Sequence, residues 1–196
     1  MSAGIKYNLN PIEGNMPEMC RFETVYRLSG GFMLDQTNLA GFSKVPPMAP
    51  LHIDFKTRKA KVVVCAKVHK KITKNQTALQ IEKGSFVTVG MHLGNGTNGG
   101  TVEKVDKSNK AYDTVTLKDT PTLEAEVGDV LFEAVAVDGT NPKALANFLN
   151  YAWTKVEDGA SVTAVGQAYE IKPSKLIVPI SEKDKESLGA RFMFTY

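Results

Sequence analysis

The amino-acid sequence predicts a mainly β protein, folded as a compact antiparallel barrel or sandwich. Three observations support this class. Segments such as 51–55 and 112–117 alternate apolar and polar residues with a period of two, as strands with one buried face do. The run 62–66 is short, apolar and rich in Val, which is typical of a strand buried on both faces. The chain also has 16 glycines and 9 prolines, enough for frequent turns between short strands.

About nine candidate strands follow one another from residue 51 onward, separated mostly by short turns, a spacing typical of sandwiches and barrels. They are 51–55, 61–68, 85–89, 101–105, 112–117, 130–137, 161–171, 175–180 and 191–195. Three tripeptides ending in Gly84, Gly128 and Gly159 precede strands at unequal spacing, which favours a recurring tight turn over a repeat architecture.

Helix is expected in two places. Asn141 and Pro142 offer an N-cap followed by proline at the first helical position, and apolar residues then recur at helical spacing through about residue 153. This predicts one amphipathic helix near residues 142–153. Ser181 and Asp184 form a pattern like a capping box, which predicts a second, short and polar helical turn. A parallel α/β fold needs a helix after nearly every strand and is excluded.

Residues 1–50 differ in composition from the rest of the chain, because prolines, methionines and the Gly30-Gly31 pair interrupt any long periodic pattern of apolar residues. We therefore expect an extended N-terminal arm over residues 1–50 and a β domain over residues 51–196. The arm contains too many apolar side chains for a solvated tail. They pack either on their own domain or on a neighbouring subunit, and the sequence leaves both alternatives open.

The overall composition excludes several classes of protein. The formal net charge of +3 is small and the charges are interspersed, so no strong nucleic-acid or membrane attraction is expected. No apolar stretch is long enough to cross a bilayer, and the N-terminus lacks the features of a signal peptide, so we expect synthesis in a cytoplasm. Cys20 and Cys65 are expected to be buried thiols.

No pattern in the sequence indicates catalysis, a cofactor or a metal. Residues 94–99 spell GxGxxG, but a strand follows them, whereas a dinucleotide site needs a helix. His52, His69 and His92 match no metal-ligand spacing, and neither cysteine lies in a catalytic motif. The acidic residues lie beside turns, and the basic cluster 56–61 is typical of a solvated strand edge. We therefore expect a protein that is not an enzyme and has no cofactor.

Several segments together resemble the phage head fiber proteins of tailed phages and prophages of Bacteroides, including the crAss-like group. These segments are 49–60, 90–96, 127–131, 146–152, 166–171 and 179–185. The likeness spans about residues 46–196. At the level of the fold, these proteins also resemble the β-tulip proteins that decorate capsids. A β-tulip-like domain is therefore one form that the expected fold can take.

The resemblance implies a virion structural protein on the outer surface of a capsid, either a head fiber or a decoration protein. It implies contacts with the major capsid protein and with sister subunits in a homo-oligomer, with a trimer favoured over a dimer. It offers no active site to carry over, and neither nucleic acid nor a membrane is expected as a partner. The residues expected to make the capsid or subunit contact are the apolar side chains of the arm: Phe22, Tyr26, Phe32, Leu34 and Phe42.

Two other functions remain as alternatives. A carbohydrate-binding β module would use Tyr151, Trp153 and Tyr169 to stack on sugars, although helix or core positions explain the first two equally well. An enzyme with carboxylates brought together from distant strands is the second alternative.

Overall fold

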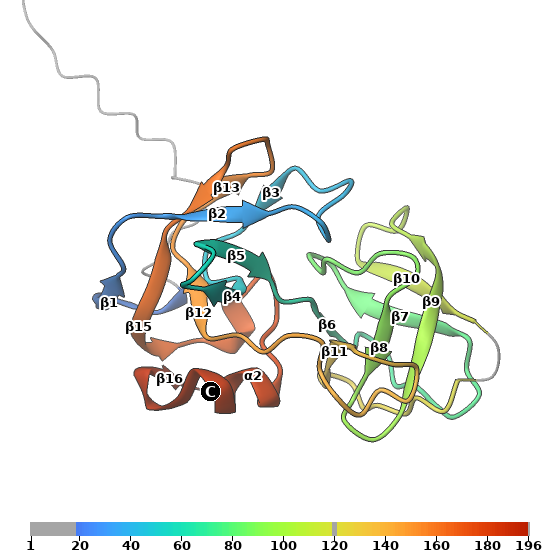
Figure 1. Cartoon of the computed structure of the whole chain (residues 1–196). Coiled ribbons are helices and arrows are strands. Elements are labelled where there is room, and N and C mark those ends of the chain that lie inside the picture. Colours follow the sequence, from blue (N-terminus) through green and yellow to red (C-terminus); the bar gives the residue numbers. More distant parts are fainter. Residues whose placement is uncertain (1–18, 119–120, 196) are drawn as a thin grey trace, which may run out of the picture.

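The computed structural model describes residues 19–118 and 121–195, and in this part of the chain the protein is mainly β, as predicted. The strands form two large sheets, which make the two lobes seen in Figure 1, and one small two-stranded ribbon. The helical elements whose bounds lie wholly within the described residues are short and belong to the C-terminal quarter of the chain.

The first sheet, here called the N/C sheet, combines strands from both ends of the chain. Its order is β1-β15-β12-β4-β5-β2-β14, and β16 pairs with β15. The bounds are β1 (Arg21–Arg27), β2 (Phe32–Asp35), β4 (Pro50–Asp54), β5 (Lys59–Val62), β12 (Phe148–Asn150), β14 (Ser161–Val162), β15 (Ala164–Ile171) and β16 (Phe192–Phe194). Most pairs are antiparallel, whereas β2 with β5 and β15 with β16 are parallel.

The second sheet, here called the barrel, consists of the middle of the chain. Its order is β6-β11-β8-β9-β10-β7. The bounds are β6 (Cys65–Lys67), β7 (Ala78–Glu82), β8 (His92–Gly94), β9 (Gly99–Asp106), β10 (Tyr112–Leu117) and β11 (Val130–Ala134). A bridge between Val68 and Ile81 joins the two ends of this order, and the His69 N–H donates to the Gln80 carbonyl at 2.9 Å. The sheet therefore curls round until its first and last strands meet.

The remaining elements are short. The ribbon pairs β3 (Lys44–Val45) with β13 (Thr154–Lys155), and the helical segments are η1 (Pro173–Lys175), α2 (Glu182–Leu188) and η2 (Gly189–Arg191). The Ser181 hydroxyl accepts the Asp184 N–H at 3.2 Å and thereby caps α2, as the sequence predicted. Gly84, Gly128 and Gly159 all adopt a positive φ, which confirms the recurring tight turn.

The apolar run between β5 and β6 has both of its faces buried. Val62 and Val64 pack into the larger core, which extends from the N/C sheet into the barrel. Val63 and Cys65 point the other way, into a second core beneath β12, β15 and α2. Because successive side chains of an extended strand point to opposite faces, one short segment contributes to both cores.

The expected helix at 142–153 is wrong. The backbone there is extended and forms β12, because its N–H groups have partners in other strands. The N–H groups of Lys143, Asn147 and Asn150 donate to the carbonyls of Glu133, Leu51 and Ala49. These long-range hydrogen bonds outweigh the helical spacing of the apolar residues, which is only a weak local preference.

The expected arm is also wrong for residues 21–50, which form β1 to β3 and the first residue of β4 and are paired with the rest of the chain. This segment packs on its own domain because several of its apolar side chains are buried in the protein's own core. Residues 1–18 lie outside the described part of the chain. The expected strands at 85–89 and 175–180 are absent as well; Phe86 and Val87 lie in the larger core.

The burial of segment 62–66 on both faces leads to a prediction about stability. Replacing Val63 or Val64 by Ala removes two buried methyl groups from one core or the other and should lower the free energy of unfolding by roughly 2 kcal/mol in each case. Urea denaturation should show one transition for both variants, because both cores share the strand. Val127→Ala is the control, since that side chain is 64% exposed. Two separate transitions would contradict a shared core.

Candidate functional site

Among the described residues, the strand β1 is the long free edge of the N/C sheet. It stands at one end of the strand order and has seven residues, whereas β14 at the other end has two. The edges of the barrel strands β6 and β7 are bridged to each other. A free edge exposes backbone N–H and C=O groups that can pair with another chain, so β1 is the first place to examine for a contact surface.

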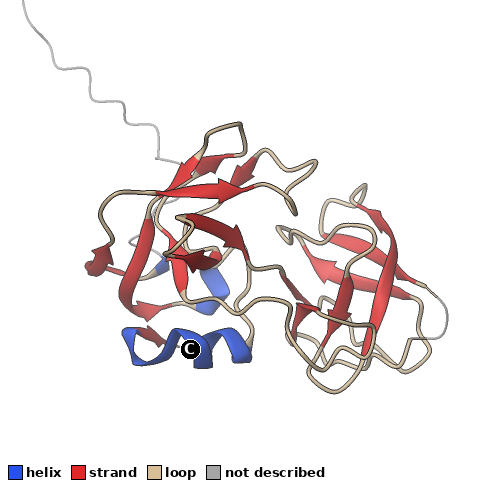
Figure 2. Ribbon diagram, viewed as in Figure 1, coloured by secondary structure: helices blue, strands red, loops and turns tan. Residues whose placement is uncertain are grey.

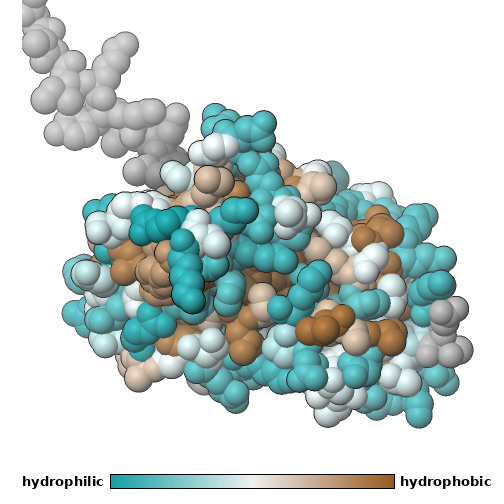
Figure 3. All heavy atoms as spheres, viewed as in Figure 1, coloured by the Kyte–Doolittle hydropathy of each residue, from teal (hydrophilic) through white to brown (hydrophobic). Residues whose placement is uncertain are grey.

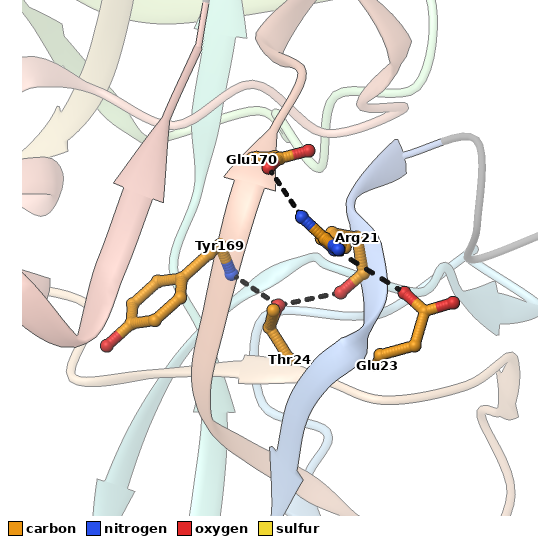
Figure 4. Close-up of polar contacts among 5 residues, drawn as sticks. All are labelled: Arg21, Glu23, Thr24, Tyr169 and Glu170. Atoms are coloured by element: carbon orange, nitrogen blue, oxygen red, sulfur yellow. Dashed lines mark hydrogen bonds and ion pairs between the residues drawn. The ribbon is translucent and has the colours of Figure 1, made fainter.

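The pairing of β1 with β15 is irregular. Arg21 is opposite Tyr169, Tyr26 is opposite Gln167 and Arg27 is opposite Val165, with a shift of register between each pair and the next. Within the irregular stretch the Thr24 hydroxyl replaces a backbone partner: it accepts the Tyr169 N–H at 2.9 Å and donates to the Arg21 carbonyl at 2.6 Å (Figure 4). The hydroxyl thus keeps β1 attached to β15 where the regular ladder is lost.

Charged side chains surround this irregular stretch. The Arg21 guanidinium lies 3.3 Å from a Glu170 carboxylate oxygen and 3.8 Å from one of Glu23 (Figure 4). Glu170 has φ +55, a left-handed conformation within β15 that is uncommon for this residue type. All three side chains are largely exposed, so the ion pairs contribute little to stability. Charges and a bulge also discourage indiscriminate pairing of a free edge.

The five residues expected to make the contact divide into three groups. Phe22 and Tyr26 lie on β1 and are 44% and 62% exposed. Phe32 and Leu34 lie on β2 and are buried in the larger core, so they are not available to a partner. Phe42 is half-buried, with its ring 4.8 Å from that of Phe86 and the Lys107 ammonium above it. Only β1 therefore presents its predicted aromatic side chains to solvent.

The region around the start of β1 is hollowed. Cys20, Arg21, Phe22, Glu170 and Lys172 are among the residues that line a shallow depression of about 320 Å³. Cys20 itself is buried in the second core, and this burial raises the pKa of its thiol to about 11. The two carboxylates of the lining, Glu23 and Glu170, are both paired with Arg21.

The second cysteine belongs to a buried network that fixes the C-terminal segment. The Asp184 carboxylate accepts hydrogen bonds from the Cys65 thiol at 3.2 Å, from the Ser181 hydroxyl and from the Ala146 N–H at 2.8 Å. Burial, followed by the nearby Asp184 charge, raises the pKa of the Cys65 thiol well above its ordinary value. These contacts hold α2 against β6 and β12.

The GxGxxG segment has a structural role. It is the connection between β8 and β9, and it packs against a second loop at Gly139. A side chain on Gly94 would come within 2.3 Å of the Gly139 carbonyl oxygen, and the Gly96 N–H donates to the same oxygen at 3.0 Å. Glycine is required here for the close approach of two backbones, so the segment gives no sign of a nucleotide site.

The aromatic residues of the carbohydrate-binding alternative are partly covered by cations. The Arg27 guanidinium lies 4.7 Å from the centre of the Tyr151 ring, and the Lys44 ammonium lies 5.8 Å from the Trp153 ring. Each cation occupies one ring face that a sugar would need. Tyr169 is half-buried in β15.

In the described part of the chain, no group of three or more His, Cys, Asp or Glu side chains could hold a metal ion. Of the described helices, none has the length and hydrophobicity needed to cross a membrane.

The comparison with protein families decides the identity. A family model described as head fiber protein matches residues 2–193, nearly the whole chain. The chain belongs to the phage head fiber family. It is therefore a structural protein of a phage virion, associated with the phage head, as the resemblance implied. The head fiber family is a structural one and gives no sign of an enzyme. Searches of curated proteins and of solved structures found no match.

The burial of Cys20 provides a probe of β1. Because the reactive form of a cysteine is the thiolate, a pKa of about 11 leaves this thiol protonated and shielded at pH 8. We expect native protein to react with a thiol reagent far more slowly than protein unfolded in urea. Thr24→Ala should loosen β1 and speed the labelling of Cys20 without affecting Cys65. Equal rates for native and unfolded protein would contradict a docked β1.

Proposed function

We propose that this head fiber family member binds the outside of the phage capsid as a decoration protein, with the β1 edge facing the shell. One observation carries the proposal. The long free edge of the N/C sheet presents Phe22 and Tyr26 to solvent, where a monomer alone gains nothing from them. Exposed aromatic side chains gathered on one element are typical of a protein contact surface.

The neighbours of these two rings strengthen the case. Arg21 and Arg27 stand at the two ends of β1, so the strand combines aromatic and arginine side chains. Tyr and Arg are enriched among the residues that dominate binding energy in protein interfaces, and Phe is enriched in interfaces generally.

The barrel is less suited than β1 to binding the capsid. Its first and last strands are bridged to each other, so it has little free edge with which to recruit another chain. It also lies at the other end of the molecule from β1 in Figure 1. We propose that the barrel is the part presented away from the shell.

A second exposed apolar spot is a candidate for contacts between sister subunits. It centres on Phe55, just after β4, which is 54% exposed and whose ring centre lies 5.5 Å from that of Phe148. Phe55 lies away from β1 in the strand order, so a subunit can use the two spots at once. We propose a homo-oligomer, a trimer in preference to a dimer, with this spot in the subunit contact. A trimer requires that the spot meet a different surface of the next subunit.

The test is binding to phage heads. Phe22→Ser and Tyr26→Ser remove exposed rings, so stability should change by no more than about 0.5 kcal/mol. Binding of the double variant to heads that lack the protein should weaken by roughly 30-fold or more, the loss typical of an interface hot spot. Co-sedimentation of the purified protein with the heads measures it.

Val89→Ser on the barrel is the matched control, because Val89 is also an exposed apolar residue, at 64%. It should bind like the wild type. If the double variant binds as well as the control, β1 is not the contact. If the wild type does not bind heads at all, the proposed function is wrong.

A further inference from the structure

A second, larger hollow of about 520 Å³ lies where the C-terminal segment meets the barrel. Much of its lining is apolar: Val130 comes from β11, and Pro173, Pro179 and Ile180 come from the stretch between β15 and α2. Ile180 is buried in the second core, and the Asp184 network holds α2 beside it. The floor of the hollow is thus apolar and firmly supported.

Three ammonium groups border this apolar floor. Lys67, Lys172 and Lys185 all line the hollow, against a single acidic lining residue, Glu182. Lys185 is paired with Glu182 at 2.6 Å, and Lys67 is paired with Glu82 at 2.9 Å. Lys172 is exposed, and no carboxylate of the described residues forms an ion pair with it. The lining therefore carries excess positive charge.

Lys172 connects the hollow to the β1 surface. It lines both the hollow and the shallow depression that Arg21 and Phe22 share. Its backbone N–H donates to the Met19 carbonyl at 2.8 Å, two residues before β1 begins. The hollow therefore adjoins the surface proposed to face the shell, and the strands β6 and β11 that line it are those of the barrel next to the N/C sheet (Figure 1).

We infer that the hollow receives an apolar side chain from an acidic segment of the capsid protein, with a carboxylate of that segment on Lys172. The inference rests on the proposed function, because the partner is the head. The apolar floor and Lys172 together determine which side chains the hollow can bind. An apolar floor favours an aliphatic or aromatic side chain, and a lysine without a carboxylate partner favours a negative charge beside it.

The experiment measures the binding of purified variants to phage heads at several salt concentrations. Lys172→Glu should weaken binding by about 10-fold or more at low salt, because it replaces attraction by repulsion. Its binding should also fall less steeply than that of the wild type as salt rises, since screened attraction has been removed. Val130→Arg, which fills the hollow with a charged group, should weaken binding at every salt concentration, provided that its thermal unfolding matches the wild type.

Lys70→Glu is the matched control, since Lys70 is an exposed lysine that does not line the hollow. It should leave binding nearly unchanged. If Lys172→Glu behaves like Lys70→Glu while the Phe22 and Tyr26 variant still loses binding, the hollow is not a contact and the proposed function stands. If both lysine variants weaken binding equally, the attraction is nonspecific and the inference is wrong. Failure of the wild type to bind heads overturns both.

Discussion

The packing of residues 62–66 on both faces is the constraint on which the rest of the structure depends. Val62 and Val64 enter the larger core, while Val63 and Cys65 enter the second core. The same segment leads from β5 in the N/C sheet to β6 in the barrel. The two lobes are therefore joined by a buried strand rather than by a flexible linker, and a change in one core is felt in the other.

This arrangement determines where the molecule can make contacts. The barrel curls until β6 and β7 meet, and the C-terminal segment covers the second core through the hydrogen bonds of Asp184. Among the described residues, the longer of the two end strands of the N/C sheet is β1, which is held to β15 through an irregular ladder and the Thr24 hydroxyl. The depression beside the exposed aromatic side chains of β1 and the lysine-lined hollow share Lys172 in their linings.

Local sequence signals predicted the features that depend on local physics. Ser181 caps α2 because its hydroxyl is three residues from the Asp184 N–H, and Gly84 lies in a turn that requires a positive φ. The helix at 142–153 failed because Asn147 and Asn150 donate to residues about 100 positions away, which no local pattern reveals.

The contact residues could be predicted only in part for the same reason. Phe22 and Phe32 were both expected in the N-terminal arm, yet one lies on an edge strand and the other in the core. Which of them is exposed depends on strand order, a property of the whole fold. The hollow at Lys172 gave no signal in the sequence, because its lining comes from segments that are distant along the chain.

Electron microscopy of phage heads carrying the bound protein tests the central claim most directly. The account predicts density for the N/C sheet against the shell, with Phe22 and Tyr26 of β1 at the capsid surface and the barrel pointing outward. Density that places the barrel against the shell, with β1 facing solvent, would contradict it.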